Sequence, residues 1–499
     1  MMATNPDYDV VVLGSGPAGQ NAALEAANRD AHVLIVEQEP NVGGACVQYG
    51  TIPSKTLRET ALTLTAFQRR SGDVYHISHD SELSICSLMK RLNEVIHAHQ
   101  QTTRLCLERA GIERACGRGR FVSPHEIGID SVGGKKSVVR ASTIVVATGS
   151  RPRNPPNVGV DHENILDSDS ILSMTYLPRS IIVLGGGVIA CEYASTFASL
   201  GVKVTMLDKA AWPLGFLDPE LVDFFLTQFK ANNSEFRGGS EIESMKWDGV
   251  SSVVARLRSG DEVRADKAFV ALGRVANLEA LAIGNAGLQA SDRGLLTVNS
   301  NCQTTVPHIY AVGDTIGPPA LASASMEQGR RAIVHALSGV QQSSAGALPA
   351  GIYTIPEIST VGLTESQAIE KNGSAIVARI NYDQIARAHI MASPSGMLKL
   401  VADAQGDKLL GVQIAGDGAT ELVHIGQMAI LGQMSVDAFA SATFNFPTMA
   451  EAYRLAALEI IHAREWKRTA ERGRLGRGRF EPAPENILSR HATGSAPVV

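Results

Sequence analysis

The chain has 499 residues, of which 44% are apolar and 19% charged, and its formal net charge is −5. A chain of this length exceeds one hydrophobic core and predicts about three domains. The mild negative charge gives no reason to expect nucleic acid or an anionic membrane as a partner, and no apolar run reaches the roughly 18 residues that span a bilayer.

The N-terminal segment predicts a nucleotide-binding βαβ unit. Residues 10–13 form a short apolar run, as a strand buried on both faces requires. Gly14, Gly16 and Gly19 follow, and a helical stretch leads to a second apolar strand that ends at Glu37. The three glycines allow, in turn, a tight turn, close approach to a pyrophosphate and close helix packing. The carboxylate at the end of the second strand is placed to accept hydrogen bonds from ribose hydroxyls.

The next motif carries a single cysteine. Cys46 lies in GGACVQYGTIPSK (residues 43–55), and Thr51 occupies the place that a C-x4-C spacing would give to a second cysteine. A thiol pair at this point would indicate a flavin-coupled dithiol reductase, but a hydroxyl cannot cycle through a disulfide. We therefore expect hydride transfer here rather than thiol chemistry, with Gly44 and Cys46 as candidate cofactor contacts.

Two further strands are predicted to end in glycine turns, and a third in a carboxylate. Residues 144–152 contain the turn at Gly149, and residues 269–277 contain the turn at Gly273. We expect these strands to close the first and second nucleotide domains. A later strand is predicted to end at Asp314, at the edge of the sheet where ligands of open α/β sheets bind.

A second nucleotide-binding signature begins in the middle of the chain. An apolar strand at 181–184 is followed by Gly185, Gly187 and Ala190, a helix, and a strand that ends at Asp208. Two complete units of this kind in one chain imply that two nucleotides bind.

Residues near the second unit give mixed signals about which nicotinamide nucleotide binds. Asp208 can accept a hydrogen bond from a 2′-hydroxyl and repels a 2′-phosphate, which favours NADH. Lys209 and the small residue Ala190 favour NADPH. We expect the site to accept both NAD(H) and NADP(H).

The C-terminal part predicts a separate α+β domain after a small polar linker at 341–350. Strands are expected at 376–381, 396–402 and 408–415, and helices at 364–371, 419–432 and 448–463. The tail from Lys467 is rich in Arg, Gly and Pro without apolar periodicity and is predicted to be disordered. The expected domains are 1–152 with 283–340, then 153–282, then 350–466, with the tail at 467–499.

The cysteines and the N-terminal residues favour a cytoplasmic location. Six scattered cysteines exclude the usual zinc and thioredoxin-like spacings and fit a reducing cytoplasm. The five cysteines other than Cys46 are expected to be small buried side chains. The N-terminal residues lack a basic segment, so no secretory signal is expected. No metal site is predicted.

The order of these motifs resembles the flavoprotein disulfide reductases that have two dinucleotide-binding domains, such as dihydrolipoamide dehydrogenase and glutathione reductase. The resemblance covers about residues 8–465. The matching stretches include GTIPSKTLRE (50–59), DSDSILSM (167–174), CEYAS (191–195), GIYTIPEISTVG (351–362) and FNFPTMAEAYR (444–454).

This resemblance implies an α/β fold with two Rossmann-like domains, one for FAD and one for NAD(P), and a C-terminal α+β dimerisation domain. It implies a homodimer or higher homo-oligomer with small-molecule nicotinamide nucleotides as its partners. The positions that match the FAD site are Gly14, Gly16, Gly19, Glu37, Lys55 and Asp314. The resemblance also places Lys55 beside the flavin, paired with Glu192, and we take these two as the catalytic candidates.

The chain departs from the disulfide reductases at two places. In FNFPTMAE, Phe446 stands where those enzymes have an acid/base histidine, while the downstream Glu451 remains. Phenylalanine cannot move protons. Together with Thr51, this change removes the dithiol half-reaction and argues against lipoamide or glutathione as substrate.

Transhydrogenases of the family match the sequence at both departures, which implies ping-pong hydride transfer between nicotinamide nucleotides of the Si-specific type. Two alternatives stay open. One is an NAD(P)H-dependent quinone reductase, and the other is a flavin-bound redox sensor with little turnover.

Overall fold

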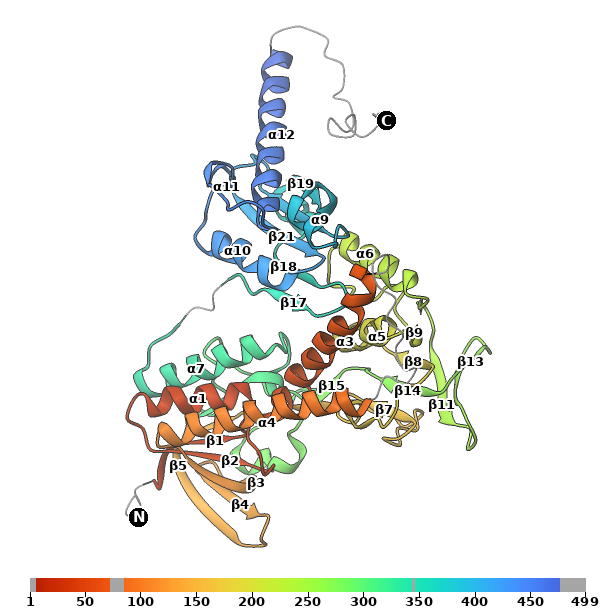
Figure 1. Cartoon of the computed structure of the whole chain (residues 1–499). Coiled ribbons are helices and arrows are strands. Elements are labelled where there is room, and N and C mark those ends of the chain that lie inside the picture. The colour runs from red at the N-terminus through yellow and green to blue at the C-terminus, as the bar shows by residue number, and fades with distance from the viewer. Residues whose placement is uncertain (1–5, 72–84, 343–345, 476–499) are drawn as a thin grey trace.

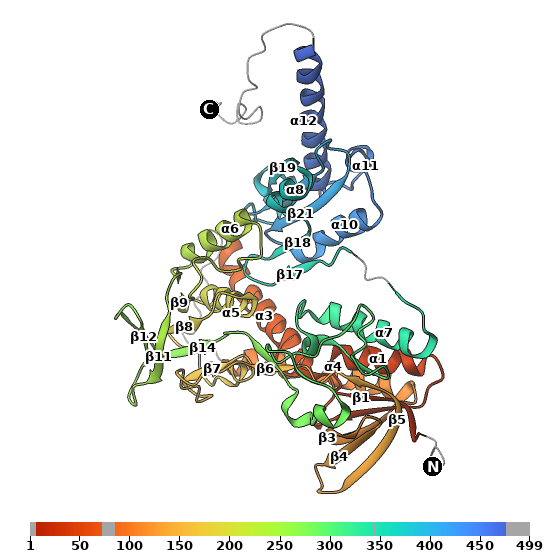
Figure 2. The ribbon, with the colours of Figure 1, turned by 180° about the vertical axis from the view of Figure 1, so that it is seen from behind.

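The computed structural model describes residues 6–71, 85–342 and 346–475; for 66–71, 85–88 and 471–475 it describes the backbone alone. Two units with parallel sheets lie next to each other, and a third, antiparallel unit lies beyond them (Figure 1). Viewed from behind, the long last helix again projects away from the body of the molecule (Figure 2).

The first unit is built on buried apolar strands. Its sheet contains β1 (Tyr8–Leu13), β2 (Val33–Glu37), β3 (Glu113–Ser123), β4 (Glu126–Ser131), β5 (Lys136–Val146) and β16 (Ile309–Ala311). β1 pairs in parallel with β2 and β5, whereas β3, β4 and β5 continue as an antiparallel ribbon.

Helices α1 (Pro17–Ala27), α4 (Ile85–Arg109) and α7 (Ala322–Ser338) pack on one face of this sheet (Figure 1). α1 and α7 cross closely because small residues meet there. A Cβ on Gly329 of α7 would lie 2.1 Å from the Ala18 carbonyl oxygen of α1. Ala276, Leu278 and Leu281 pack in the core on the other face. The short α2 (Gly44–Gln48) and the long α3 (Thr51–Ser71) leave the sheet toward the second unit.

The second unit repeats this plan. Its parallel sheet has the order β10 (Glu235–Arg237), β9 (Lys203–Leu207), β8 (Ser180–Leu184), β14 (Lys267–Val270) and β7 (Ile165–Asp167). Helices α5 (Val188–Ser199) and α6 (Pro219–Ala231) belong to it, together with a three-stranded meander of β11 (Ile242–Trp247), β12 (Val253–Leu257) and β13 (Glu262–Ala265). The chain passes between the two units twice. The two connecting segments form an antiparallel pair of short strands, β6 (Ser150–Pro152) and β15 (Arg274–Ala276).

The third unit is a five-stranded antiparallel sheet. Its strands, in order, are β17 (Ala350–Ile352), β18 (Ile358–Gly362), β21 (Leu409–Ala415), β20 (Met397–Ala402) and β19 (Ile376–Asn381). Helices α8 (Glu365–Asn372), α9 (Ala386–Ile390), α10 (Ala419–Leu431), α11 (Val436–Ser441) and α12 (Glu451–Leu475) complete it.

The expected strands and helices of this unit are confirmed, but β17, β18, α9 and α11 were not predicted. The prediction that the tail is disordered from Lys467 onward is wrong for its first part, because α12 continues to Leu475. Arg464 on this helix bonds Asp407 and Asp437, which holds the helix to the sheet unit. Residues 476–499 lie outside the described residues.

The cysteines are placed unevenly. Cys191 and Cys302 are buried as expected, but the expectation is wrong for Cys106 and Cys116, which are exposed. They lie on outward-facing positions of α4 and β3, where the apolar face is supplied by other residues. The side chain of Cys86 is outside the described residues.

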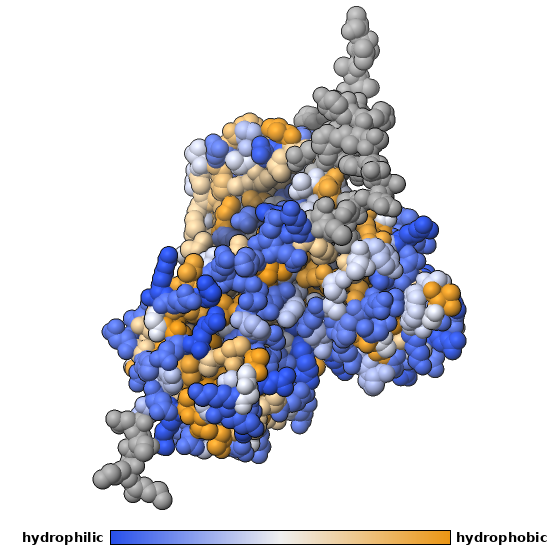
Figure 3. All heavy atoms as spheres, turned by 60° about the horizontal axis from the view of Figure 1, so that its bottom comes forward, coloured by the Kyte–Doolittle hydropathy of each residue, from blue (hydrophilic) through white to orange (hydrophobic). Residues whose placement is uncertain are grey.

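The face seen in Figure 3 is largely hydrophilic, with apolar side chains in scattered patches. Among the described residues, no helix has both the length and the apolar character that a membrane span requires.

Candidate active site

The first glycine turn brings the chain ends of β1, β5 and α1 together. Gly14 has φ +103°, and a Cβ there would lie 2.4 Å from the carbonyl oxygen of Ala147. A Cβ on Gly19 would lie 2.0 Å from the carbonyl oxygen of Gly14, so α1 can approach the turn only with glycine at that position. A Cβ on Gly16, in contrast, would meet nothing within 4 Å. Space for a ligand therefore remains beside the helix N-terminus.

Glu37 lies at the end of β2 and is bonded to this turn. Its Oε2 accepts hydrogen bonds from the backbone nitrogen of Ser15 at 2.8 Å and from the Ser15 hydroxyl at 2.7 Å. The carboxylate is therefore held at the rim of the turn.

A cavity of about 2600 Å³ extends from this turn to the second unit. Most of the predicted site residues line it, from both units. They are Gly14, Gly16, Glu37, Gly44, Cys46, Lys55, Gly149, Gly187, Glu192, Gly273 and Asp314. Gly19, Gly185, Ala190, Asp208 and Lys209 are not part of its lining.

The second glycine turn explains why some of these residues lie behind the cavity wall. Gly185 has φ +123°, and a Cβ there would lie 2.5 Å from the carbonyl oxygen of Ala271, so this glycine serves close packing. Ala190 is fully buried in α5. A Cβ on Gly187 would meet nothing within 4 Å, as at Gly16 in the first unit.

Asp208 and Lys209 follow β9 on the outer side of this turn. Asp208 Oδ1 accepts a hydrogen bond of 2.6 Å from the Ala210 nitrogen, and its Oδ2 lies close to Gly186. Lys209 is exposed to solvent. The carboxylate is thus oriented by the backbone, while the lysine is not constrained.

Lys55 and Glu192 form an ion pair that joins the two units. Lys55 Nζ of α3 lies 2.6 Å from Glu192 Oε2 of α5, and the side chains are 24% and 8% exposed. Glu192 Oε1 also accepts a hydrogen bond of 2.9 Å from the Tyr353 nitrogen. The Lys55 ammonium lies 5.0 Å from the centroid of the Tyr353 ring. A positive charge is therefore held at the cavity wall between the units.

The segment 353–357 contacts both helices that carry the ion pair, and no role was predicted for it from the sequence. Arg58 donates to the Thr354 carbonyl oxygen at 3.1 Å and pairs with Glu357 at 3.1 Å. The Ile355 nitrogen donates to the Ser195 hydroxyl at 3.1 Å. α3 and α5 thus both hold this segment of the third unit against the ion pair. The motif GIYTIPE was visible in the sequence, but its contacts were not.

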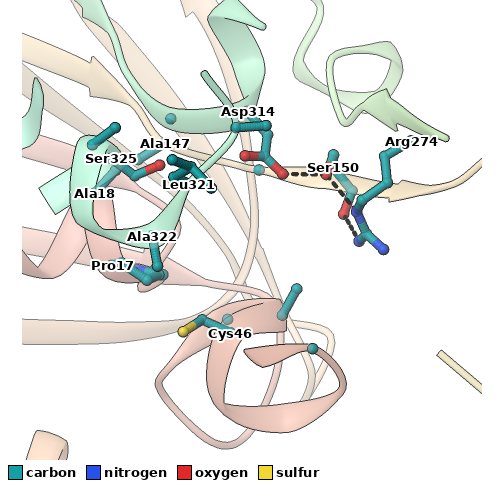
Figure 4. Close-up of a pocket in the computed structure, with 18 of the residues that line it drawn as sticks. Pro17, Ala18, Cys46, Ala147, Ser150, Arg274, Asp314, Leu321, Ala322 and Ser325 are labelled. Atoms are coloured by element: carbon teal, nitrogen blue, oxygen red, sulfur yellow. Dashed lines mark hydrogen bonds between the residues drawn. The ribbon is translucent and has the colours of Figure 1, made fainter. Parts of the chain in front are cut away.

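Asp314 lies in the cavity wall opposite Cys46 (Figure 4). The expectation that it ends a strand is wrong, because β16 stops at Ala311 and Asp314 lies in the short 3-10 helix Gly313–Ile316. Its Oδ2 accepts a hydrogen bond of 2.5 Å from the Ser150 hydroxyl. Arg274 in turn donates to Ser150. Neither Ser150 nor Arg274 was predicted as a site residue from the sequence.

Cys46 lies on α2 and Thr51 begins α3. Burial raises the pKa of the Cys46 thiol, although a hydrogen bond from Thr51 and the charge of Lys55 act in the opposite direction. The thiol is therefore protonated and a poor nucleophile at neutral pH. Phe446 is 66% exposed and is not part of the cavity lining.

Comparison with known proteins gives consistent matches. Residues 8–329 match the family described as pyridine nucleotide-disulphide oxidoreductase, and residues 348–457 match the dimerisation domain of the same name. A protein of Mycobacterium tuberculosis (strain ATCC 25177 / H37Ra) named soluble pyridine nucleotide transhydrogenase is 42% identical over 459 residues, which cover 91% of this chain and 97% of that protein. The protein of that name from Escherichia coli (strain SMS-3-5 / SECEC) is 40% identical over 466 residues, covering 91% and 98%.

Two solved structures share the fold over nearly their whole length. LpdA from Mycobacterium tuberculosis has a TM-score of 0.84 and 27% identity, covering 90% of this chain and 99% of that one. The HOCl-induced flavoprotein disulfide reductase RclA from Escherichia coli has a TM-score of 0.82 and 25% identity, covering 90% and 99%.

Proposed function

The chain belongs to the pyridine nucleotide-disulphide oxidoreductase family, and from this membership we propose that it is an FAD-dependent transhydrogenase. It passes a hydride between NADPH or NADH and NAD⁺ or NADP⁺. The observation that carries this proposal is the combination of an intact Lys55–Glu192 pair in a cavity shared by both glycine turns with Thr51 and Phe446 at the positions of the dithiol machinery.

The first unit fits FAD. The N-terminus of α1 begins at Gly16 without a side-chain cap, so its backbone N–H groups are available to a phosphate. Glu37 is placed for ribose hydroxyls, and Asp314 faces the same cavity. Gly44, Cys46 and Gly149 leave room for a flat ring system, since none presents a bulky side chain.

The second unit fits a nicotinamide nucleotide. The N-terminus of α5 at Gly187 also lacks a side-chain cap. Gly273 has φ +97° and a Cβ there would meet nothing within 4 Å, which leaves space along the turn after β14. Asp208 lies outside the cavity lining but beside the glycine turn at the end of β9, the position at which this fold binds a ribose hydroxyl.

FAD, when bound, supplies the atom that accepts a hydride from one nicotinamide and returns it to another. The residues of the chain act by position and charge. Lys55, held by Glu192, would present a positive charge at the cavity wall, and this charge would stabilise the negative charge that a hydride adds to the bound flavin. A shared nicotinamide site requires that one nucleotide leaves before the other enters, which gives ping-pong kinetics. No acid/base residue is needed, because a hydride carries its proton and both electrons together.

The third unit supports assembly into a homodimer. Residues 348–457 match a dimerisation domain, and apolar side chains on this unit are exposed. These include Met428, Leu431, Met434 and Phe446. The free cysteines among the described residues support a reducing location such as the cytoplasm.

Anaerobic mixing of the purified protein with NADPH and thio-NAD⁺ tests the proposed function. Formation of thio-NADH with parallel double-reciprocal lines is the expected result. Flavin reduction without transfer to thio-NAD⁺, together with fast transfer to a quinone, would contradict it and assign the protein to the quinone reductases.

A further inference from the structure

Three residues from distant parts of the chain form a hydrogen-bonded series at the cavity wall (Figure 4). Arg274 Nε donates to the Ser150 hydroxyl oxygen at 2.8 Å, and Arg274 Nη2 donates to the Ser150 carbonyl oxygen at 2.7 Å. The Ser150 hydroxyl then donates to Asp314 Oδ2 at 2.5 Å. The series ends on a carboxylate that faces the ligand cavity.

The donors and acceptors in this series leave one arrangement of protons. A guanidinium has five N–H donors and no acceptor, so Arg274 cannot receive the hydroxyl proton of Ser150. A serine hydroxyl has a single proton, which must therefore point to Asp314. Arg274 thus sets the direction in which Ser150 donates. Arg274 also donates a hydrogen bond to the backbone carbonyl oxygen of Ser150, which limits movement of the serine.

Arg274 belongs to the crossing between the two nucleotide units. β15, which begins at Arg274, pairs with β6, which begins at Ser150. Arg274 Nη1 also donates to the Ser168 hydroxyl at 3.0 Å, and the guanidinium lies 3.5 Å from Asp169. These two residues follow β7 of the second sheet. One guanidinium therefore contacts the second unit and, through one serine, a carboxylate of the first.

We propose that Arg274 is a positioning residue that acts through Ser150 on Asp314 and so links the second unit to the FAD-binding carboxylate. With Oδ2 occupied by Ser150, Oδ1 is the oxygen left for a ligand in the cavity, and the described residues donate no hydrogen bond to it. The inference rests on the proposed function, because it takes FAD as the ligand that Asp314 meets.

A double-mutant cycle on FAD affinity tests this inference. Apoprotein of the wild type, Ser150→Ala, Arg274→Lys and the double variant is titrated with FAD, and the dissociation constants are compared. Each single variant is expected to bind FAD about tenfold more weakly, the effect of losing one hydrogen bond to a charged group. Since both changes break one series, the double variant should also lose about tenfold rather than about a hundredfold. The flavin midpoint potential should shift in the same direction in both single variants.

Arg153→Lys is the matched control. Arg153 lies three residues after Ser150, and its side chain is exposed and is not part of the cavity lining. It is expected to leave FAD affinity unchanged. Ser150→Thr, which keeps the hydroxyl, should bind FAD more tightly than Ser150→Ala. A merely structural serine would not give that rescue.

Two results would overturn the inference. One is Arg274→Lys with the affinity and potential of the wild type, and the other is a fully multiplicative loss in the double variant. Failure of the proposed function would be seen separately, as wild-type protein that does not bind FAD or does not form thio-NADH. If Arg274→Lys does not fold, the comparison of Ser150→Ala with Ser150→Thr still decides whether the hydroxyl acts on the cofactor site.

Discussion

At the scale of single residues, the cavity wall contains one lysine that is held by one glutamate. Lys55 is only partly exposed, and Glu192 is bonded both to it and to the Tyr353 backbone. Such a charge costs no reorganisation when negative charge develops beside it, because its position is already fixed. We therefore propose that the pair contributes to the rate of hydride transfer by its charge, without any proton transfer.

Lys55→Met should slow reduction of the bound flavin by NADH about a hundredfold, the typical loss when one preorganised electrostatic group is removed. The measurement is stopped-flow bleaching of flavin absorbance. Lys135→Met, a change at an exposed lysine between β4 and β5, is the control and should react like the wild type. A rate for Lys55→Met within twofold of the wild type would exclude this role.

We propose that Asp208 contributes to the preference between the two nucleotides, because it lies at the end of β9 beside the second glycine turn. It repels a 2′-phosphate by roughly 1 to 4 kcal/mol at about 4 Å, depending on the local dielectric. Asp208→Asn keeps the oxygen that accepts from Ala210 but removes the charge. The ratio of kcat/KM for NADPH over NADH should therefore rise about fivefold, in line with the lower end of that energy. An unchanged ratio would mean that the ribose lies elsewhere.

Thr51→Cys restores the sulfur spacing but not the chemistry. Phe446 leaves a dithiol without an acid/base partner, so the single variant should show no dihydrolipoamide oxidation above background. The assay is NADH formation from NAD⁺ and dihydrolipoamide. The double variant Thr51→Cys with Phe446→His serves as comparison. Appreciable activity of the single variant would remove the argument drawn from these two positions.

The site residues predicted from the sequence follow a local spacing, whereas the site residues that were not predicted meet through contacts between distant segments. Gly14, Gly16 and Gly19 are recognisable because a tight turn imposes a local spacing on them. Ser150 and Arg274 have no such spacing, since their contact arises from the pairing of β6 with β15, which are far apart in the chain. A single sequence does not contain that pairing.

At the scale of elements, a buried ion network fastens the second unit to the third. Lys399 of β20 is 2% exposed and lies 2.9 Å from Asp218, 2.7 Å from Glu220 and 2.8 Å from Glu365. Burial lowers the pKa of Lys399, but its hydrogen bonds to the carboxylates outweigh this and keep the pKa above its ordinary value. The hydrogen bond from Arg379 is the main reason that the pKa of Glu220 falls from 4.5 to about 2. The stabilising contribution of Glu220 is thus complete above pH 4.5 and is lost as the pH falls toward 2.

Lys399→Met should destabilise the protein by about 3 kcal/mol or more, because Asp218 would remain buried without its positive partner. The measurement is the urea midpoint of the FAD-loaded protein. Lys371→Met, at the exposed end of α8, is the matched control and should unfold like the wild type. Equal midpoints for both variants would show that the network is not needed for stability.

Elements with strong local patterns were predicted well. The strand at 376–381 coincides with β19, and the two glycine-turn units have their strands in the expected places. β18 was missed because five residues next to Pro356 carry little periodicity, and its strand conformation depends on pairing with β21. α12 extends past residue 463, and the first turn beyond that point is held to the sheet unit by Arg464, which pairs with Asp407 and Asp437, and by Lys467, which donates to the Ala404 carbonyl oxygen.

At the scale of the whole molecule, apolar side chains on the third unit are exposed in the single chain and are candidates for burial in an interface. Met428 is 64% exposed on α10, and Phe446 is 66% exposed. Large apolar side chains gathered on one unit are typical of an interface. Because this unit matches a dimerisation domain, we expect a second copy of the chain to bury these side chains.

Met428→Glu should therefore shift the protein from dimer toward monomer in analytical ultracentrifugation, because it places a charge in an apolar interface. Val250→Glu is the control, since Val250 is 83% exposed in the turn between β11 and β12, far along the chain from the third unit. The control should sediment as the wild type does. A Met428→Glu protein that remains a dimer would place the interface on another surface.

The lone thiol of Cys46 also bears on how thiol-directed inhibitors can act at the cavity. Trivalent arsenicals and gold compounds inactivate dithiol enzymes by bridging neighbouring sulfurs or binding a thiolate. Thr51 supplies no second sulfur, and burial keeps the Cys46 thiol in its unreactive form. Cys46 therefore has no sulfur at position 51 with which such an agent could form a bridge, and, among the described residues, the thiols left open to these agents are the exposed Cys106 and Cys116, which do not line the cavity.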